Sequence, residues 1–269
     1  MSDLKGAVLG SPIKHSLSPL LHTSAYKFLG ISGEYSAIEV TSGSLGDFLA
    51  SADSSFNYFS LTMPLKEEAL SLDLDFDSES KRIRSINTLV KDGSRWKASS
   101  TDGSGFASAL KNAGYKKFEK VLILGAGGTA RAIAGVIDEF TSEVHVMGRS
   151  QSRMQTIATC VESAEFEYLS WNDSLSIAQY DLVVNTTPAG AADLFADTVS
   201  KSQDKVLFDV IYKPWPTVLA QRWSDRGGTV LNGLELLLYQ GIDQLEKVTS
   251  IPDPKALADY LRSVLSSRK

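Results

Sequence analysis

The sequence predicts an α/β protein with two domains, the second of them a doubly wound parallel sheet of the Rossmann type. Its 269 residues exceed the usual length of a single domain. Short apolar runs rich in β-branched residues alternate with longer stretches of helical period, the pattern of parallel α/β sheets. A glycine-rich turn directly follows one of these apolar runs and precedes a helical stretch. These three observations together predict the fold class.

The composition limits the classes of partner. Hydrophobic residues make up 43% of the chain and charged residues 22%, as in ordinary globular proteins. The net charge of −5 lacks the basic surplus typical of nucleic-acid binding, and no apolar run approaches the ~20 residues of a membrane span. The first residues do not resemble a signal peptide, and the single cysteine, Cys160, excludes an intramolecular disulfide and a multi-cysteine metal site. We expect a cytoplasmic protein with a small-molecule substrate and no nucleic-acid, membrane or metal partner; a homodimer is left open.

The first hundred residues contain several elements in order. We expect strands at residues 6–9, 34–40 and 58–62, and a hairpin of 87–91 with 95–98 that turns at Asp92-Gly93. A helix is predicted over 19–29, with Ser18 at its N-cap and Pro19 in its first turn. A second helix is predicted to start near Pro64.

From residue 121 onward the alternation becomes more regular. Six strands are expected, with helices between most of them, which suits a doubly wound sheet. The expected strands are 121–124, 143–147, 165–169, 181–185, 206–210 and 229–231. The last segment, 233–269, is predicted to form two helices separated at 251–254, where two prolines occur.

The glycine-rich turn is the first candidate site. Gly125, Gly127 and Gly128 follow the strand 121–124 and open the next helix. The first glycine permits a tight turn, the second lets the backbone approach a pyrophosphate, and the helix start offers free N–H groups. The third glycine of the fingerprint is replaced by Ala130, a substitution that the fingerprint allows. A merely structural turn is the alternative, but the strand, glycines and helix together favour nucleotide binding.

The residues after the next strand indicate which nucleotide is bound. An NAD site usually places Asp or Glu at the end of that strand, and this chain has no acid there. Arg149, Ser150 and Arg153 instead provide two cations and a hydroxyl, which suit a 2′-phosphate. The alternative is that the arginines are solvated and Ser150 caps a helix. The sequence therefore favours NADP as the cofactor.

A second group of polar residues lies near the ends of the first strands. Ligands of open parallel sheets bind beyond the carboxyl ends of strands, so these side chains could converge. Hydroxyl, amide, ammonium and carboxylate groups together suit a small polyhydroxylated anion. Each residue also has a structural alternative, as a helix cap, a solvated lysine or a hairpin residue. The group consists of Ser16, Ser18, Thr62, Lys66, Asn87 and Asp102.

Several motifs, in one order along nearly the whole chain, resemble those of the shikimate dehydrogenase family, which includes quinate dehydrogenases. The opening GSPIKHSLSP at 10–19, SLTMPLK at 60–66, SINTLV at 85–90 and TDGSG at 101–105 match its first half. NTTPAG at 185–190, DVIYKP at 209–214 and NGLELLLYQ at 232–240 follow in the family order. Three positions depart from the usual family pattern, namely Ser60, Ser100 and Ala191.

The resemblance implies a role for each matching residue. Lys66 and Asp102 would form the acid/base pair, with the alternative that Asp102 only orients a lysine that stays cationic. The implied substrate-binding residues are Ser16, Ser18, Thr62, Asn87, Tyr212 and Gln240. The implied cofactor-binding residues are Gly125, Ala126, Gly127, Gly128, Thr129, Gly148, Arg149, Ser150, Arg153, Thr187, Val210 and Gly233, the valine and last glycine lying beside the nicotinamide.

The same resemblance implies the activity and the division of the chain. We expect a substrate-binding catalytic domain at 1–103, an NADP-binding domain at 104–236, and C-terminal helices at 237–269 that pack on the first domain. The implied reaction is the NADP-dependent, reversible reduction of 3-dehydroshikimate to shikimate in the chorismate pathway of aromatic amino-acid biosynthesis. The nearest alternative is a quinate/shikimate dehydrogenase with relaxed substrate or NAD use. A methylene-tetrahydrofolate dehydrogenase and a catalytically silent NADP-binding protein are more distant alternatives.

Overall fold

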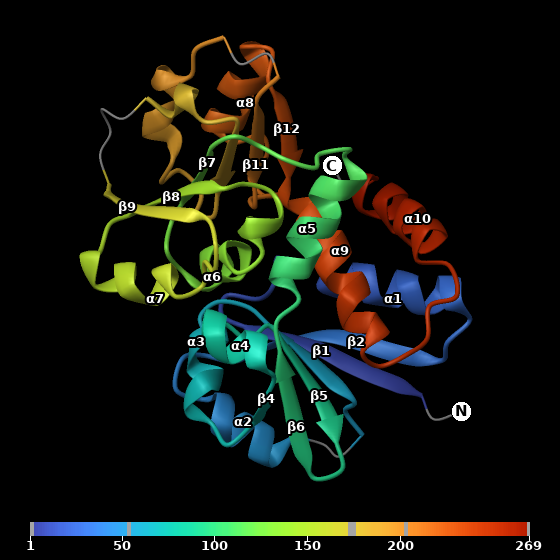
Figure 1. The fold of residues 1–269 in the computed structure, drawn as a ribbon. Helices are drawn as coiled ribbons and strands as arrows, with labels where there is room; N and C mark the ends of the chain where they lie inside the picture. The colour runs from blue at the N-terminus through green and yellow to red at the C-terminus, as the bar shows by residue number, and fades with distance from the viewer. Residues whose placement is uncertain (1–2, 53–54, 172–175, 202–203, 268–269) are drawn as a thin grey trace. The chain divides into compact units, whose positions relative to one another are not determined.

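A computed structural model of the chain describes residues 3–52, 55–171, 176–201 and 204–267. The contacts divide the chain into two compact units (Figure 1). Unit 1 comprises Met1–Gly105 and Leu237–Lys269, and unit 2 comprises Phe106–Leu236. The divisions therefore fall after residues 105 and 236, whereas the sequence predicts them after 103 and 236.

Unit 1 is built on a mixed six-stranded sheet with the order β2-β1-β3-β5-β6-β4. Strand β1 is parallel to β2 and β3, while β5 is antiparallel to both β3 and β6, and β4 is parallel to β6. The hairpin predicted from Asp92-Gly93 is β5–β6. The strands are β1 (Leu4–Gly10), β2 (Gly33–Glu39), β3 (Tyr58–Leu61), β4 (Asp75–Phe76), β5 (Thr88–Asp92) and β6 (Arg95–Ser99).

Helices cover both faces of this sheet. On one face Val8, Tyr35 and Tyr58 share a core with α1, α9 and α10; on the other Ala7, Leu9 and Phe59 share a core that includes residues of α2 and α3. The C-terminal helices thus belong to the core of unit 1. The helices wholly within unit 1 are α1 (Ser18–Leu29), α2 (Leu45–Ser51), α3 (Leu65–Glu68), α4 (Ser78–Ile83) and α10 (Pro254–Ser266). Two further helices, α5 (Asp102–Asn112) and α9 (Gly233–Glu246), run across the divisions after residues 105 and 236.

The start of α1 differs from the sequence prediction. Ser18 is the first residue of the helix, and the cap position is occupied by Leu17, which makes no side-chain cap hydrogen bond. The assignment of Ser18 as N-cap was therefore wrong. The Oγ of Ser16, two residues earlier, accepts the N–H of Ser18 at 3.2 Å. The short elements α2, β4 and α4 were not predicted, because segments of two to seven residues are too short to establish a hydrophobic period.

Unit 2 contains a parallel six-stranded sheet with the order β12-β11-β10-β7-β8-β9. This is the strand order of a doubly wound dinucleotide-binding sheet, so the predicted fold class is confirmed. Each of the six strands lies within one residue of its predicted ends. They are β7 (Val121–Leu124), β8 (Glu143–Gly148), β9 (Glu165–Ser170), β10 (Leu182–Asn185), β11 (Val206–Asp209) and β12 (Thr229–Asn232).

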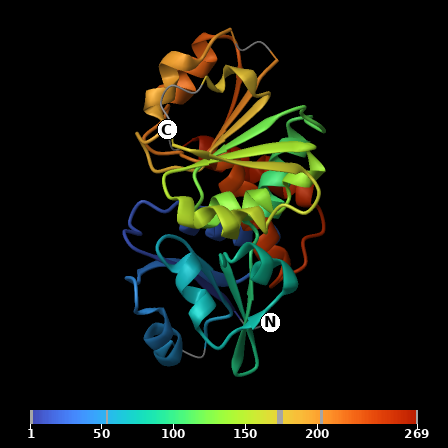
Figure 2. The ribbon, with the colours of Figure 1, turned by 60° about the vertical axis from the view of Figure 1, so that its left-hand side comes forward.

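Helices lie on both sides of the unit 2 sheet. Both ribbon views place α6 (Gly128–Ala134) and α7 (Met154–Ala158) on one side and α8 (Val218–Asp225) on the other (Figures 1 and 2). Leu122 and Leu124 of β7 share a core with Trp223 of α8. Short 3-10 turns complete the structure at Ala69–Ser71, Ile137–Glu139, Gln151–Arg153, Ile177–Gln179 and Asp193–Thr198.

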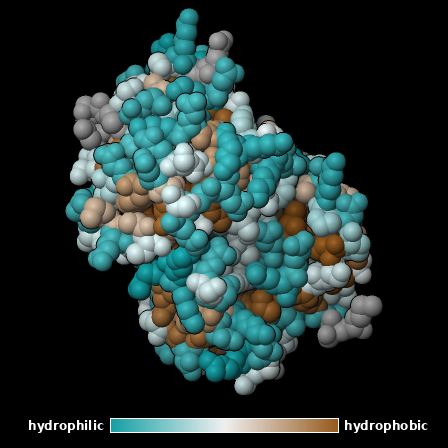
Figure 3. Space-filling model, in the orientation of Figure 1, coloured by the Kyte–Doolittle hydropathy of each residue, from teal (hydrophilic) through white to brown (hydrophobic). Residues whose placement is uncertain are grey.

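Hydrophilic residues dominate the face shown in Figure 3. Among the residues that the structure describes, none of the helices combines the length and the apolarity that a membrane span requires.

Candidate functional site

The loops after β1 and β3 carry the first predicted binding residues. Ser16 is half-buried and Ser18 is buried, and they lie next to each other through the Ser16 Oγ contact described above. Thr62 follows β3, and its N–H donates to the carbonyl of Leu9 at 2.9 Å. A Cβ on Gly10 would lie 2.5 Å from Thr62 Cγ2, so glycine at this position lets the two loops approach.

Lys66 and Asp102 form an ion pair in unit 1. Lys66 lies in the single turn of α3, and Asp102 is the first residue of α5. The Lys66 Nζ contacts Asp102 Oδ2, and the two side chains are 17% and 5% exposed. A solvated first-turn lysine, the alternative considered from sequence, would be far more exposed. A shielded ammonium–carboxylate pair of this kind can hold and transfer a proton.

Asn87 joins this pair from the end of the loop before β5. Its Nδ2 donates to Asp102 Oδ1 at 2.8 Å and to Thr101 Oγ1 at 3.0 Å, and it lies 3.4 Å from Gln240 Oε1. Its Oδ1 accepts the N–H of Thr101 at 2.8 Å. Asn87, Asp102 and Gln240 are all buried, so their polar groups depend on one another for hydrogen bonds. Four predicted residues therefore meet at one place: Lys66, Asn87, Asp102 and Gln240.

Gln240 reaches Asn87 because α5 and α9 pack closely at one point. A Cβ on Gly105 would lie 2.5 Å from the backbone nitrogen of Gln240, so only glycine permits this approach. The Thr101 hydroxyl donates to the carbonyl of Gln240 at 3.0 Å. The Ser104 hydroxyl likewise donates to the carboxylate of Asp243, whose pKa burial raises. These contacts fix α9 against the start of α5 inside unit 1.

The two serines that depart from the family pattern have different surroundings. Ser60 is buried and its hydroxyl contacts both Tyr35 and Gln244. The hydroxyl oxygen of Ser100 is buried without a hydrogen-bond partner. Gln244 itself was not identified from the sequence. The available signal was its position one helical turn after Gln240, which places the two amides on the same face of α9.

Unit 2 contains the glycine turn between β7 and α6. Gly125 has φ +106°, and a Cβ there would lie 2.5 Å from Thr186 Oγ1, so both its backbone and its surroundings require glycine. Gly127 caps α6, and a Cβ built on it meets no atom within 4 Å. Ala126 is buried, while Gly128 and Thr129 open the helix. The turn thus leaves its backbone accessible at Gly127, where a phosphate group could approach.

The predicted phosphate-binding residues follow β8 and are all exposed. Arg149 and Ser150 directly follow Gly148, and the Arg153 Nη1 donates to the carbonyl of Ala126 at 3.2 Å. The Arg153 contact shows that this loop adjoins the glycine turn. A Cβ on Gly148 would lie 2.1 Å from the hydroxyl of Tyr168, which donates to the carbonyl of Ser150 at 2.7 Å. Tyr168 was not identified from the sequence.

A buried hydrogen-bond network holds the loops after β10 and β11. Asn185 Oδ1 accepts from the Thr187 hydroxyl at 2.6 Å, and Asn185 Nδ2 donates to Asp209 Oδ1 at 3.1 Å. Burial raises the pKa of Asp209, while hydrogen bonds from Thr217, Ile211 and Asn185 oppose the increase.

The remaining predicted residues follow β11 and β12. A Cβ on Gly233 would lie 2.0 Å from the carbonyl oxygen of Val210, so these two residues are direct neighbours. Tyr212 is half-buried in the loop after β11. It belongs to unit 2, unlike the other predicted substrate-binding residues.

Within the described ranges no cluster of histidine, cysteine, aspartate and glutamate side chains is arranged to hold a metal ion. Cys160 is buried, and its thiol donates to the carbonyl of Thr156 at 3.3 Å.

Comparisons with known proteins match both units. The sequence model described as "Shikimate dehydrogenase substrate binding domain" matches residues 8–89, and that described as "Shikimate / quinate 5-dehydrogenase" matches residues 107–211. A protein of Methanococcoides burtonii named shikimate dehydrogenase (NADP(+)) is 37% identical over 243 residues, which are 88% of this chain and 89% of the relative.

Solved structures agree with the sequence comparison. The crystal structure of shikimate dehydrogenase from Mycobacterium tuberculosis superposes with a TM-score of 0.86 at 33% identity, covering 98% of this chain and 99% of that one. The structure of the Thermus thermophilus enzyme in complex with NADP(H) and shikimate has a TM-score of 0.82 at 31% identity, covering 97% of this chain and 99% of that one. Its sequence motifs, its two sheets and these similarities show that the chain belongs to the shikimate dehydrogenase family.

Proposed function

We propose that this protein catalyses the reversible, NADP(H)-dependent interconversion of 3-dehydroshikimate and shikimate. The observation that carries the proposal is the shielded Lys66–Asp102 pair, with Asn87 donating to the same carboxylate. An enzyme that interconverts an alcohol and a ketone needs a group that exchanges a proton with the oxygen atom, and this pair supplies one. A relative named shikimate dehydrogenase (NADP(+)) is 37% identical over 88% of the chain, which supports the proposal.

The residues of unit 2 fit NADP. The turn at Gly125–Gly128 opens helix α6, and a Cβ built on Gly127 meets no atom within 4 Å, so the backbone there is open to a pyrophosphate group. Arg149 and Arg153 flank Ser150 on an exposed loop that adjoins this turn, and no acidic side chain follows β8. Two guanidinium groups suit a dianionic 2′-phosphate, which NAD lacks. Thr187, Val210 and Gly233 lie at the carboxyl ends of the neighbouring strands, where the nicotinamide half would bind.

The substrate is assigned to the polar residues of unit 1. Ser16 and Ser18 hold the carboxylate, and Thr62, Asn87 and Gln240 contact the carboxylate or ring hydroxyls. The family motifs also assign Tyr212 to the substrate. These groups offer hydroxyl and amide donors, which match an anion that carries several hydroxyl groups. The assignment follows the family motifs residue by residue.

The chemistry follows from the Lys66–Asp102 pair. Hydride exchange with the ring carbon is the chemistry that NADP supplies when bound. In the reductive direction the Lys66 ammonium donates a proton to the developing alkoxide, and in the oxidative direction the Lys66 amine removes that proton. Asp102 holds the lysine in position through Oδ2, while its Oδ1 accepts from Asn87. Because Lys66 and Asp102 are already held together before the reaction, less entropy is lost in reaching the transition state.

The decisive experiment measures nicotinamide absorbance with the purified protein and four pairings of substrate and cofactor. We expect the highest kcat/KM with shikimate and NADP, and much lower values with quinate or with NAD. Activity confined to quinate with NAD would overturn the proposal. A cytoplasmic location and a homodimer are further proposals, which cell fractionation and analytical ultracentrifugation test.

A further inference from the structure

Gln244 is a buried side chain that the proposed mechanism does not use. It is 1% exposed and lies on α9, one turn after Gln240. Its Nε2 donates to the backbone carbonyl of Asn87 at 3.1 Å and to Thr88 Oγ1 at 2.9 Å. Its Oε1 accepts from the Ser60 hydroxyl at 2.7 Å. Both protons of the amide therefore have partners, and the side chain contacts the backbone of a predicted binding residue.

Backbone groups fix the direction of these hydrogen bonds. A backbone carbonyl can only accept, so the Gln244 atom facing the Asn87 carbonyl must be the nitrogen. A backbone N–H can only donate, so the Asn87 atom that faces the Thr101 N–H must be the oxygen. The Thr88 hydroxyl lies between the two amides. It accepts from Gln244 and must donate its own proton to Asn87 Oδ1, at 2.7 Å.

This series of hydrogen bonds leads to Asp102 and its ion pair with Lys66. With its oxygen occupied by Thr88 and Thr101, the Asn87 amide can present only its nitrogen to Asp102 Oδ1. Asp102 Oδ2 then remains for Lys66. At the other end the Ser60 hydroxyl donates to Gln244, so the Tyr35 hydroxyl, 2.5 Å away, must donate to Ser60. Every proton from Tyr35 to Asp102 thus has one orientation.

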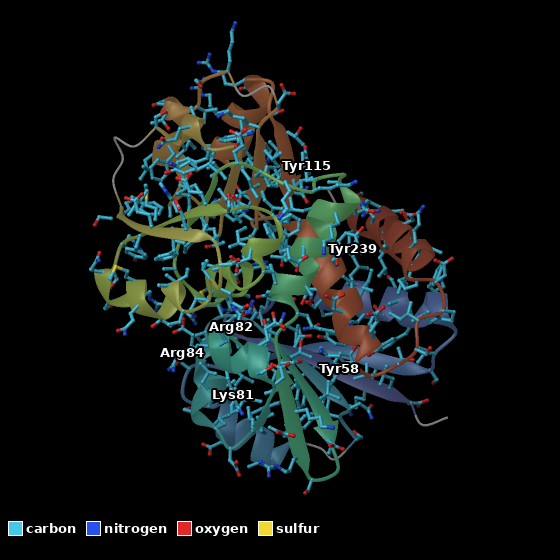
Figure 4. All side chains as sticks on the ribbon, viewed as in Figure 1. Tyr58, Lys81, Arg82, Arg84, Tyr115 and Tyr239 are labelled. Carbon is cyan, nitrogen blue, oxygen red and sulfur yellow. The ribbon has the colours of Figure 1, made fainter. Side chains whose placement is uncertain are left out.

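The surrounding groups keep that orientation at neutral pH. Burial lowers the pKa of His22 from 6.5 to about 3, so the imidazole is neutral. The His22 ring stacks on Tyr35, with the ring centroids 4.0 Å apart. Its Nδ1 forms a hydrogen bond with the hydroxyl of Tyr58, which is labelled in Figure 4. Burial raises the pKa of Tyr35 and of Tyr58 above the ordinary value, so both keep their hydroxyl protons. No group of this cluster changes its donor or acceptor role near pH 7.

We propose that Ser60, Gln244 and Thr88 form a directional hydrogen-bond relay, in which Gln244 and Thr88 are positioning residues for the reaction. They hold the Asn87 amide with its nitrogen toward Asp102, and so orient the carboxylate that pairs with Lys66. This inference rests on the proposed function, because it takes Lys66 and Asp102 as the pair that exchanges the proton. Without the relay, Asn87 Oδ1 is held by the backbone N–H of Thr101 alone.

The sharpest test replaces the Thr88 hydroxyl by a methyl group of the same size. Thr88→Val removes the donor to Asn87 Oδ1, and we expect kcat/KM for shikimate to fall about tenfold, the size of one lost buried hydrogen bond. KM for NADP should stay within twofold of the parent value. Thr88→Ser keeps the hydroxyl and should restore at least half of the activity. Equal losses in the two variants would mean that packing, not the hydroxyl, matters, and would overturn the relay.

Gln244→Met provides a second variant in case Thr88→Val does not fold. It keeps the length of the side chain and removes both the donor and the acceptor, so we expect a similar loss. Thr141→Val is the matched control. Thr141 is a buried threonine of unit 2 that bonds to the carbonyl of Glu119 at 3.0 Å, so this variant loses a comparable hydroxyl away from the relay. Its kcat/KM should equal the parent value. A kcat/KM within twofold of the parent in a folded Thr88→Val or Gln244→Met protein overturns the proposal.

A readout without turnover separates this inference from the proposed function. The side-chain amide resonances of Asn87, identified by their loss in Asn87→Asp, should be sharp in the parent protein and shifted or broadened in Thr88→Val. If the parent protein did not oxidise shikimate, the proposed function would fail, while these resonances would still report on the relay. Unchanged Asn87 resonances in Thr88→Val would overturn the relay even in an active enzyme.

Discussion

The two units build their candidate sites by different means. In unit 1 the site consists of side chains, because Lys66, Asn87, Asp102 and Gln240 contact one another directly. In unit 2 the glycine turn consists of backbone, and it is open at Gly127, where a Cβ would meet no atom within 4 Å. A side-chain site binds its ligand through the donors and acceptors that its side chains present. A backbone site at glycines can bind a ligand because no side-chain atoms cover the backbone.

This difference determines how each site responds to substitution. Removing a polar atom in unit 1 leaves a buried partner without its hydrogen bond, which costs about 1–3 kcal/mol. Adding a single carbon in unit 2 brings it to 2.5 Å from Thr186 at Gly125 or 2.0 Å from the Val210 carbonyl at Gly233. The Lys66–Asp102 cluster is therefore sensitive to lost atoms, and Gly125 and Gly233 are sensitive to added ones. The following variants test this contrast.

The largest effect is expected at Lys66. Lys66→Ala removes the group that exchanges the proton, and general acid–base catalysis typically contributes ~10²–10⁴-fold, so turnover should fall at least ~100-fold. The affinity for NADP(H), measured by fluorescence titration, should change little because the residue belongs to unit 1. Lys97→Ala, at an exposed lysine of the same unit, is the control and should keep full turnover. Near-parental turnover in Lys66→Ala would remove the lysine from the mechanism.

Acid should destabilise the polar core of unit 1 through His22. The pKa of His22 is about 3 in the folded protein against 6.5 in the unfolded chain, so the unfolded chain binds the additional proton below pH 6.5. Stability from this group is therefore complete above pH 6.5 and is lost as the pH falls toward 3, by about 1.4 kcal/mol per pH unit at most.

Urea unfolding of the parent and of His22→Asn measures this loss. We expect the parent to lose about 2 kcal/mol more than the variant between pH 6 and pH 4.5. Buried carboxylic acids such as Asp209 and Asp243 are present in both proteins and cancel in the difference. Parallel pH dependences of the two proteins would show that His22 is not the group responsible.

Two glycines of the same turn should respond differently to alanine. Gly125→Ala places a Cβ at φ +106° and against Thr186, so it should lower the free energy of unfolding by about 2 kcal/mol as well as weakening NADP binding. Gly127→Ala points its Cβ into open space and has an ordinary φ of −85°. It should weaken NADP binding with an unchanged urea midpoint. If both variants kept the parental NADP affinity, the turn would not be the pyrophosphate site.

The smallest effect is expected at Arg149. Arg149→Ala should lower the preference for NADP over NAD by about tenfold, because only NADP carries the 2′-phosphate that the guanidinium would bind. The ratio of the two kcat/KM values measures this preference. Arg222→Ala, at an arginine of unit 2 whose ion pair with Asp197 is exposed, should leave the ratio unchanged. An unaltered ratio in Arg149→Ala would assign the phosphate to other residues.

Much of the fold was predictable because its signals are local. The six strands of unit 2 were predicted to within one residue, since buried parallel strands appear as short, nearly continuous apolar runs. The Asp92-Gly93 turn likewise identified the β5–β6 hairpin. The short elements α2, β4 and α4 escaped prediction because they contain too few residues for a period. Ser18 was misplaced as an N-cap because its residue type favours that position, although Leu17 occupies it.

The sequence by itself determined the doubly wound sheet, the glycine turn and the family, because these depend on residue types at fixed spacings along the chain. Only the tertiary structure decided which polar residues meet. Residues 66, 87, 102 and 240 are far apart in sequence, and Gln244 and Ser60 are separated by 184 positions yet share a hydrogen bond. The direction of each bond depends on backbone carbonyl and N–H groups whose positions follow from folding alone. Contacts over such separations leave no periodic trace in the sequence, because they depend on how the sheet and helices pack.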